Sequence, residues 1–177
     1  MPAPLRRIVT GADTEGRSTI KQDAPVTVFW ELETLGGMEA SAIWEVQTPL
    51  TELTADGDPL TPLTLQPPSG AIRFFRLTFP PDSAANHDQQ AIVAEIAERV
   101  PSILQAMDPK RGIGMHQTDT IDLGYVVSGA VDLVLEDGSR TTLKAGDSYV
   151  QLGTWHAWDN SYDEPCVFVV AMIRRAE

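Results

Sequence analysis

MHQTDTIDLGYVVSG at residues 115–129 and GDSYVQLGTWHAWDN at residues 146–160 are the two segments that decide the fold of this chain. Both combine the alternating pattern of a β-strand with side chains that bind metals or exchange protons. Each ends in residues that favour turns or loops. The two segments therefore predict polar chemistry on neighbouring strands of one β-structure.

Side chains alternate between the two faces of a strand, so every second residue shares a face. In the first segment one face carries His116, Thr118, Thr120 and Asp122. In the second segment the same alternation groups His156, Trp158 and Asn160. If both polar faces point inward, His116, Asp122 and His156 converge.

The sequence around these segments reads as a series of short strands at 119–127, 130–136, 139–143, 148–152, 155–159 and 166–173. Turn residues separate them, such as Ser128-Gly129 and Asp137-Gly138. Strands at this spacing favour an antiparallel sandwich or barrel. We therefore expect an all-β fold, an antiparallel β-barrel or jelly roll, in a single domain over residues 1–177.

Two further regions precede the motif strands at 112–173. Residues 1–79 predict an extra N-terminal layer of strands at 6–9, 18–22, 26–32, 42–46 and 71–79. Residues 82–107 change to helical spacing and predict an amphipathic helical insertion. Pro101 removes a backbone donor, so two short helices, or one ending near Arg99, are expected. His87, at the helix entrance, is expected to cap the helix or face solvent.

The two segments resemble the two motifs of the cupin superfamily. The first family motif runs glycine, five residues, His-x-His, three or four residues, Glu, six residues, Gly; the second ends Pro-x-Gly-x-x-His-x-x-x-Asn. Asp122 to Gly129 has the first motif's spacing, and Gly153 to His156 with Asn160 reproduces the end of the second. The match covers residues 112–160, and it implies a cupin barrel around a small-molecule pocket.

Departures from the family motifs concern the metal site. Typical cupins hold iron, manganese, nickel, zinc or another divalent ion with three histidines and a carboxylate. Thr118 stands where the second histidine would be, Asp122 replaces the glutamate and Gln151 replaces the proline. The resemblance therefore carries over only His116, Asp122 and His156 as candidate catalytic and metal-ligating residues.

Two chemistries remain open for these three residues. Two imidazoles and one carboxylate can bind a divalent transition metal and leave positions open for substrate. Without a metal, Asp122 and a histidine can act as a general acid and base pair. The function is accordingly an enzyme of the lyase, isomerase, decarboxylase or oxygenase type, or alternatively a non-catalytic binding or sensor cupin without metal.

Other residues are candidates for lining the pocket: Thr118, Thr120, Tyr125, Gln151 and Trp158. β propensity alone also explains the two threonines. Trp158 shares its face with His156, although large aromatic residues more often fill a core. The face of Tyr125, like that of Tyr149, is uncertain beside the turn glycines.

The composition of the 177-residue chain limits the classes of partner that it is expected to bind. A net charge of -12 without a basic stripe argues against nucleic acid. No segment predicts a membrane span or a signal peptide. The lone Cys166 lies in an apolar run and is expected to be a small buried side chain, which fits a cytoplasmic protein. The partners expected are a small organic ligand or substrate and, by resemblance to cupins, a second copy in a homodimer.

Overall fold

The computed structural model describes residues 5–50, 54, 56–59, 61–112 and 114–176. Within these residues the chain is an all-β fold with a small helical insertion, as predicted. Its strands are β1 (Arg6–Ala12), β2 (Ser18–Pro25), β3 (Phe29–Leu32), β4 (Met38–Gln47), β5 (Ala71–Phe79), β6 (Thr120–Ser128), β7 (Ala130–Leu135), β8 (Arg140–Lys144), β9 (Ser148–Gln151), β10 (His156–Asp159) and β11 (Cys166–Arg174). The α-helices are α1 (Gln89–Arg99) and α2 (Pro101–Ala106), and 3₁₀ turns lie at Glu33–Leu35, Asp82–Ala84 and Pro109–Arg111.

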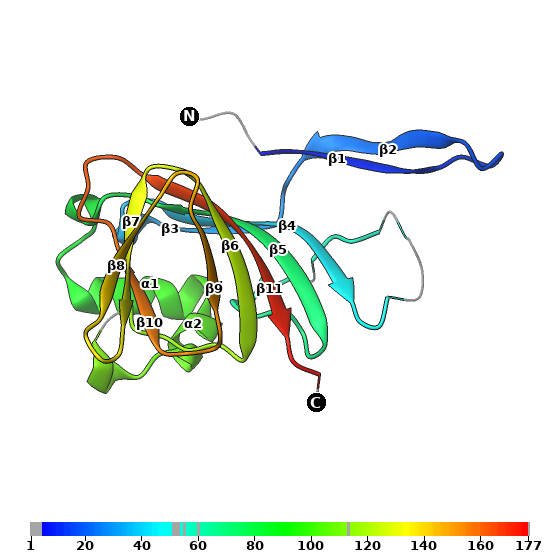
Figure 1. Cartoon of the computed structure of the whole chain (residues 1–177). Coiled ribbons are helices and arrows are strands. Elements are labelled where there is room, and N and C mark those ends of the chain that lie inside the picture. The colour runs from blue at the N-terminus through cyan, green and yellow to red at the C-terminus, as the bar shows by residue number, and fades with distance from the viewer. Residues whose placement is uncertain (1–4, 51–53, 55, 60, 113, 177) are drawn as a thin grey trace.

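Two antiparallel sheets form the body of the molecule. The larger sheet has the strand order β3-β4-β5-β11-β6-β9, and the smaller has the order β10-β7-β8. Figure 1 shows the smaller sheet facing the part of the larger sheet that β9, β6 and β11 form. Side chains from both sheets meet there in a buried cluster of Val126, Val131, Leu143, Cys166 and Phe168. Cys166 is fully buried, as expected from its apolar surroundings, and burial raises the pKa of its thiol to about 11.

The N-terminal strands divide between two structures. β3, β4 and β5 join the larger sheet, whereas β1 and β2 pair only with each other and project from the body as an arm (Figure 1). The expectation that all strands of residues 1–79 form one layer is therefore corrected for β1 and β2. At the base of the arm, the Arg7 guanidinium donates to the backbone oxygen of Ile43 at 2.9 Å and lies over the Trp44 ring.

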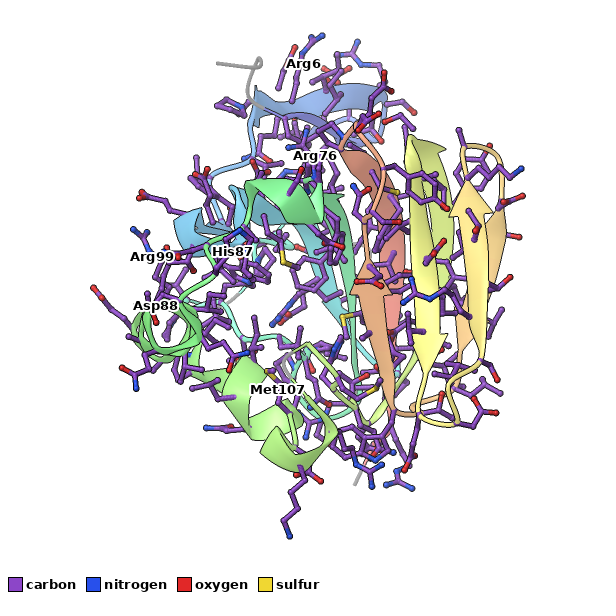
Figure 2. The ribbon with its side chains drawn as sticks, turned by 90° about the vertical axis from the view of Figure 1, so that its left-hand side faces the viewer. Arg6, Arg76, His87, Asp88, Arg99 and Met107 are labelled. Carbon is purple, nitrogen blue, oxygen red and sulfur yellow. The ribbon has the colours of Figure 1, made fainter. Side chains whose placement is uncertain are left out.

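The helical insertion covers the other half of the larger sheet. Asp88 caps α1, because its carboxylate accepts hydrogen bonds from the backbone N–H groups of Gln90 and Ala91. Pro101 separates α1 from α2, as predicted, and His87 faces solvent. Ile92 and Ile96 pack with residues of β3, β4, β5 and β11 in a second buried cluster. Figure 2 shows both helices to one side of the strands, with Asp88 at the start of α1 and Met107 after α2. No helix in the described part of the chain is long and apolar enough to cross a membrane.

One row of paired residues crosses five strands on the inner face of the larger sheet. Successive Cα pairings connect Glu45, Arg73, Met172, Asp122 and Gln151. All five side chains are buried, and Arg73 forms an ion pair with Glu45 at 2.6 Å. The register therefore places Asp122 and Gln151 side by side inside the molecule.

Candidate functional site

The site is built where three segments meet at one end of the sheets. Asp122 lies on β6 and faces Gln151 at the end of β9. His156 begins β10, and its backbone forms a β-bridge with His116, in the extended segment before β6. The polar faces of both motif segments therefore do point inward, and they bring together residues distant in sequence.

The two histidines form a close pair. Their backbones exchange two hydrogen bonds of 2.9 and 3.0 Å, and their ring centroids are 4.3 Å apart. Nδ1 of His116 lies 2.8 Å from the carbonyl oxygen of Gly114, and Nδ1 of His156 lies 2.8 Å from that of Thr154. A carbonyl oxygen only accepts, so each contact is a hydrogen bond when Nδ1 carries the proton. The Nε2 atom of each neutral ring then keeps its lone pair.

Burial keeps both imidazoles uncharged at neutral pH. It lowers the pKa of His116, although the hydrogen bond to Gly114 opposes that shift. Burial, together with the repulsion that a protonated His116 would exert, lowers the pKa of His156 to about 4. Two imidazolium ions this close would also repel each other. The two imidazoles can therefore accept hydrogen bonds or bind a metal ion. They are weak bases.

A chain of hydroxyl groups leads to the carboxylate of Asp122. The hydroxyls of Thr118 and Thr120 are 2.8 Å apart, and the Thr120 hydroxyl donates to Asp122 Oδ1 at 2.6 Å. Because a hydroxyl has one hydrogen, Thr118 must donate to Thr120 in this arrangement. All three side chains are buried. The chain is thus oriented toward Asp122, and the Thr118 oxygen remains able to accept.

Asp122 is a carboxyl group in a poorly solvated place. Burial raises its pKa to about 6, and the hydrogen bond from Thr120 works against this rise. Its only hydrogen bond found among the described side chains is the one from Thr120. A carboxyl group with this pKa can both hold and release a proton near neutral pH.

Gln151 and a tight turn fix the position of His156. Nε2 of Gln151 donates to the carbonyl and hydroxyl oxygens of Thr154, at 2.9 and 2.6 Å, and lies 3.0 Å from Nδ1 of His156. Gly153 has a φ of +61°, and a Cβ there would approach the backbone oxygen of Thr118 to 2.8 Å. A side chain at position 153 would therefore push this turn away from the strand that carries Asp122.

Aromatic rings close the other side of the site. The Tyr149 ring lies over Gly124, where a Cβ would meet it at 2.1 Å. Trp158 lies edge-on to His156, with centroids 5.8 Å apart, and contacts Tyr149 and Phe168. Burial, with the nearby charge of Asp122, raises the pKa of the Tyr149 phenol, which therefore stays protonated. Sequence reasoning left Tyr149 undecided, although its pairing with a glycine is the signal that places it inside.

The predicted site residues are distributed as follows. The polar inner face holds Thr118, Thr120, Asp122, Gln151 and His156, with the half-buried His116 and Trp158 beside it. Tyr125, predicted to line the pocket, lies on the outer face of β6 and is half exposed, because it is an odd number of residues from Asp122.

The described residues do not assemble the expected three-residue metal site. Among them, no group of three His, Cys, Asp or Glu side chains is placed to hold a metal ion. The histidines pair with each other, whereas Asp122 is engaged by Thr120. The side chains thus offer two imidazole ligands without the carboxylate, which does not fit the predicted set.

A hollow of about 740 Å³ borders the beginning of β6. Thr118 and Thr120 are among its lining residues, together with Gln66, Gln117, Arg174 and Arg175. The residues described as lining it do not include His116, Asp122 or His156. It therefore adjoins the hydroxyl chain at Thr118 and Thr120.

Comparisons with known proteins agree with this architecture. Residues 103–172 match the family model described as Cupin domain. Phomopsin biosynthesis cluster protein C' of Diaporthe leptostromiformis is 46% identical over 61 residues, 33% of this chain and 32% of that protein. The cupin-domain-containing oxidoreductase fogC of Aspergillus ruber is 26% identical over 87% of this chain and 63% of its own length. The chain thus matches about a third of the length of the first of these relatives.

Among solved structures, a Cupin 2 conserved barrel domain protein from Salinispora arenicola CNS-205 aligns over 77% of this chain and 75% of its own. The identity is 15% and the TM-score is 0.41. The chain is therefore similar to cupin domain proteins over residues 103–172.

Proposed function

We propose that this cupin is an enzyme that moves a proton on a small organic molecule, with Asp122 as the group that exchanges the proton. The observation that carries the proposal is the buried chain from Thr118 through Thr120 to Asp122, beside two uncharged histidines. A buried carboxyl with one hydrogen bond lowers the stability of the fold. Groups that are destabilising in this way are typical of functional sites.

The residues around Asp122 suit this role in different ways. Its pKa, raised to about 6 by burial, lies close to neutral pH, where acid and base catalysis is most effective. The neutral histidines present Nε2 lone pairs that can accept hydrogen bonds from a substrate hydroxyl or amide. Tyr149 and Trp158 supply apolar surface that holds a ligand and limits water.

The named relatives support small-molecule chemistry. Two of them are called cupin-domain-containing oxidoreductases, and others are biosynthesis cluster proteins for phomopsin and oryzines. From these names we propose only that the substrate of this chain is a small organic molecule.

We further propose that two copies pair through the outer face of β6 and β9. Leu123 and Val150 are paired there and are 46% and 61% exposed. The exposed apolar side chains around them are Ile121, Tyr125, Val127 and Leu152. Apolar surface of this extent marks interfaces, and a patch that lies on one face can pair with its own copy in an isologous dimer.

The enzyme proposal is tested with deuterium oxide. Full-length protein is incubated with a pooled extract of small metabolites in deuterium oxide, and the mixture is returned to water before mass spectrometry. We expect at least one compound to gain carbon-bound deuterium or to change its mass with the native chain. Asp122→Asn should abolish this change, whereas Asp163→Asn, an exposed carboxylate, should leave it intact.

A compound that is retained by the native chain but stays chemically unchanged and free of deuterium would contradict the enzyme proposal. That outcome would favour the alternative, a cupin that binds or senses a small molecule without converting it. Conversion that survives in Asp122→Asn would contradict the role assigned to Asp122.

A further inference from the structure

The hollow of about 740 Å³ lies at one end of the larger sheet, where β6 begins beside the end of β11 (Figure 1). Ile121 of β6 pairs there with Ile173 of β11, and both side chains are an odd number of residues from an inner-face neighbour on their strand. The hollow therefore reaches the outer face of the sheet. It is a different space from the inner face that carries Asp122 and His156.

The charged side chains at this hollow have partners. Arg175 forms an ion pair with Asp119 at 3.1 Å. Arg174 donates to the backbone oxygen of Pro67 at 3.0 Å. Recognition of a ligand in the hollow is therefore left to the neutral polar groups of its wall, and two glutamines supply them.

Gln66 presents hydrogen-bond donors to the hollow. Its side chain contacts the backbone N–H of Asp119 at 2.9 Å. Because a backbone N–H only donates, the contacting atom is Oε1, and the NH₂ group is on the other side of the amide. This NH₂ group has no partner among the residues that the structure describes, so its two hydrogens are available. Asp119 also lines the hollow, which places the amide of Gln66 at its wall.

Gln117 presents a hydrogen-bond acceptor to the same hollow. Its Nε2 donates to the backbone oxygen of Gly153 at 2.6 Å. A carbonyl oxygen only accepts, so Oε1 of Gln117 is the atom that remains, and no described residue donates to it. Gly153 lines the hollow too. Both amides are thus held by backbone groups before any ligand enters, which lowers the entropy cost of binding.

We propose that this hollow binds a small neutral organic amide, whose carbonyl oxygen accepts from Gln66 and whose N–H group donates to Gln117. A carboxylate would place an oxygen against Oε1 of Gln117, and an ammonium group would place a donor against the NH₂ group of Gln66. Either ligand would therefore leave one glutamine group opposed by a like group. An amide carries both a donor and an acceptor and satisfies both glutamines.

Apolar surface and volume fit a ligand of this class. Ile121 is 45% exposed, and Ile173 beside it is half-buried, so a small hydrocarbon body can cover both. The volume is within the range of small-molecule sites. The inference goes beyond the proposed enzyme function, because the residues described as lining the hollow do not include His116, Asp122 or His156.

The lactam 2-piperidone is the probe for this site, and cyclohexanone, a ring of the same size without the N–H group, is its match. The full chain is titrated with each compound, and backbone amide resonances are followed by NMR. We expect 2-piperidone to shift Gln66, Gln117 and Asp119. It should bind about fivefold more tightly than cyclohexanone, which is the effect of one hydrogen bond.

Two glutamine variants test the assigned donor and acceptor. Gln66→Glu keeps an oxygen for the backbone N–H of Asp119 but replaces the NH₂ group with a second oxygen. Gln117→Met removes the acceptor and keeps the length of the side chain. Each should weaken 2-piperidone binding by about fivefold. Gln105→Met, at an exposed glutamine of α2 outside this hollow, should leave binding unchanged, as should Leu123→Glu on the outer face of β6.

Four results would overturn the proposal: no saturable binding of 2-piperidone, equal binding of 2-piperidone and cyclohexanone, unchanged binding in the glutamine variants, or shifts centred on Asp122 and His156. Gln117→Met keeps the test decisive if Gln66→Glu does not fold. Because Asp122 does not line the hollow, Asp122→Asn should bind 2-piperidone normally, even if the enzyme proposal fails.

Discussion

The imidazole rings of His116 and His156 lie with their centroids 4.3 Å apart, and each ring places Nδ1 against a backbone carbonyl. The backbone bridge between the two residues fixes this arrangement, because it closes the segment before β6 onto β10. Two rings this close affect each other's protonation. Their protonation states must therefore be considered together.

Nitrogen NMR of the ring atoms tests the state of this pair. We expect both rings to be neutral at pH 7, with the proton on Nδ1 and the lone pair on Nε2. Burial and the neighbouring ring lower the pKa of His156 to about 4, so its signals should remain those of a neutral ring down to pH 5. A charged ring or an Nε2–H form of His156 at pH 7 would disprove this assignment.

The variant Asp122→Asn tests how much the buried carboxylate of Asp122 lowers the free energy of unfolding. Burial raises the folded-state pKa of Asp122 to about 6, from an ordinary 3.8, so the folded chain binds more protons between these values. The folded state therefore loses stability as the pH rises through this window, and the loss is complete above about pH 6. We expect the variant to be more stable at pH 7.5, by up to roughly 3 kcal/mol.

Urea unfolding of the native chain and of Asp122→Asn at pH 4 and pH 7.5 provides the measurement. The gain in stability of Asp122→Asn over the native chain should be smaller at pH 4, where the native carboxyl is protonated. His156 acts in the opposite direction, since its lowered pKa makes folding less favourable as the pH falls toward 4. The comparison at equal pH removes that contribution. A destabilised variant at pH 7.5 would mean that a partner stabilises the carboxylate.

Metal titration distinguishes a site with two imidazole ligands from the predicted site of His116, Asp122 and His156. Because the histidines pair without Asp122, we expect zinc to perturb both rings together and to saturate only well above equimolar amounts. His156→Ala should abolish the effect, and Asp122→Asn should leave it unchanged. Near-stoichiometric metal in chain purified without a nickel column, lost in Asp122→Asn, would show that the three residues do converge.

Leu123→Glu tests the proposed pairing of two copies. Leu123 and Val150 face each other on the exposed side of the larger sheet, and a charge there would be buried in the interface. Light scattering should give twice the 19.3 kDa chain mass for the native protein and the monomer mass for Leu123→Glu. Thr141→Glu, exposed on β8, is the control and should remain a dimer. A monomeric native chain would refute the pairing.

Much of the fold could be predicted because period-two patterns and turn residues specify strands locally. The alternation around His116 and Asp122 correctly assigned the inner face of β6, and Pro101 correctly divided the helices. The arm of β1 and β2 could not be foreseen, because a strand pattern does not say which sheet it joins.

Strand parity could predict which candidate residues on β6 lie inside the molecule, but not which side chains contact one another. The alternation of side chains along β6 predicted that Asp122 lies inside. Whether Asp122 contacts His156 or Thr120 depends on the strand register and on the reach of each side chain, and a single sequence does not specify these. Tyr149 shows the same limit. Its inward position follows from the absence of a side chain on Gly124, its partner across the strands.

Titration of the Asp122 carboxyl carbon by NMR shows whether this group can hold and release a proton near neutral pH. We expect an inflection near pH 6 that is absent in Asp122→Asn. In Thr120→Val the inflection should move upward, because this change removes the hydrogen bond that lowers the pKa of Asp122. Thr120→Ser should restore the native value. An inflection below pH 4 in the native chain would show that Asp122 is fully ionised at neutral pH and does not exchange a proton there.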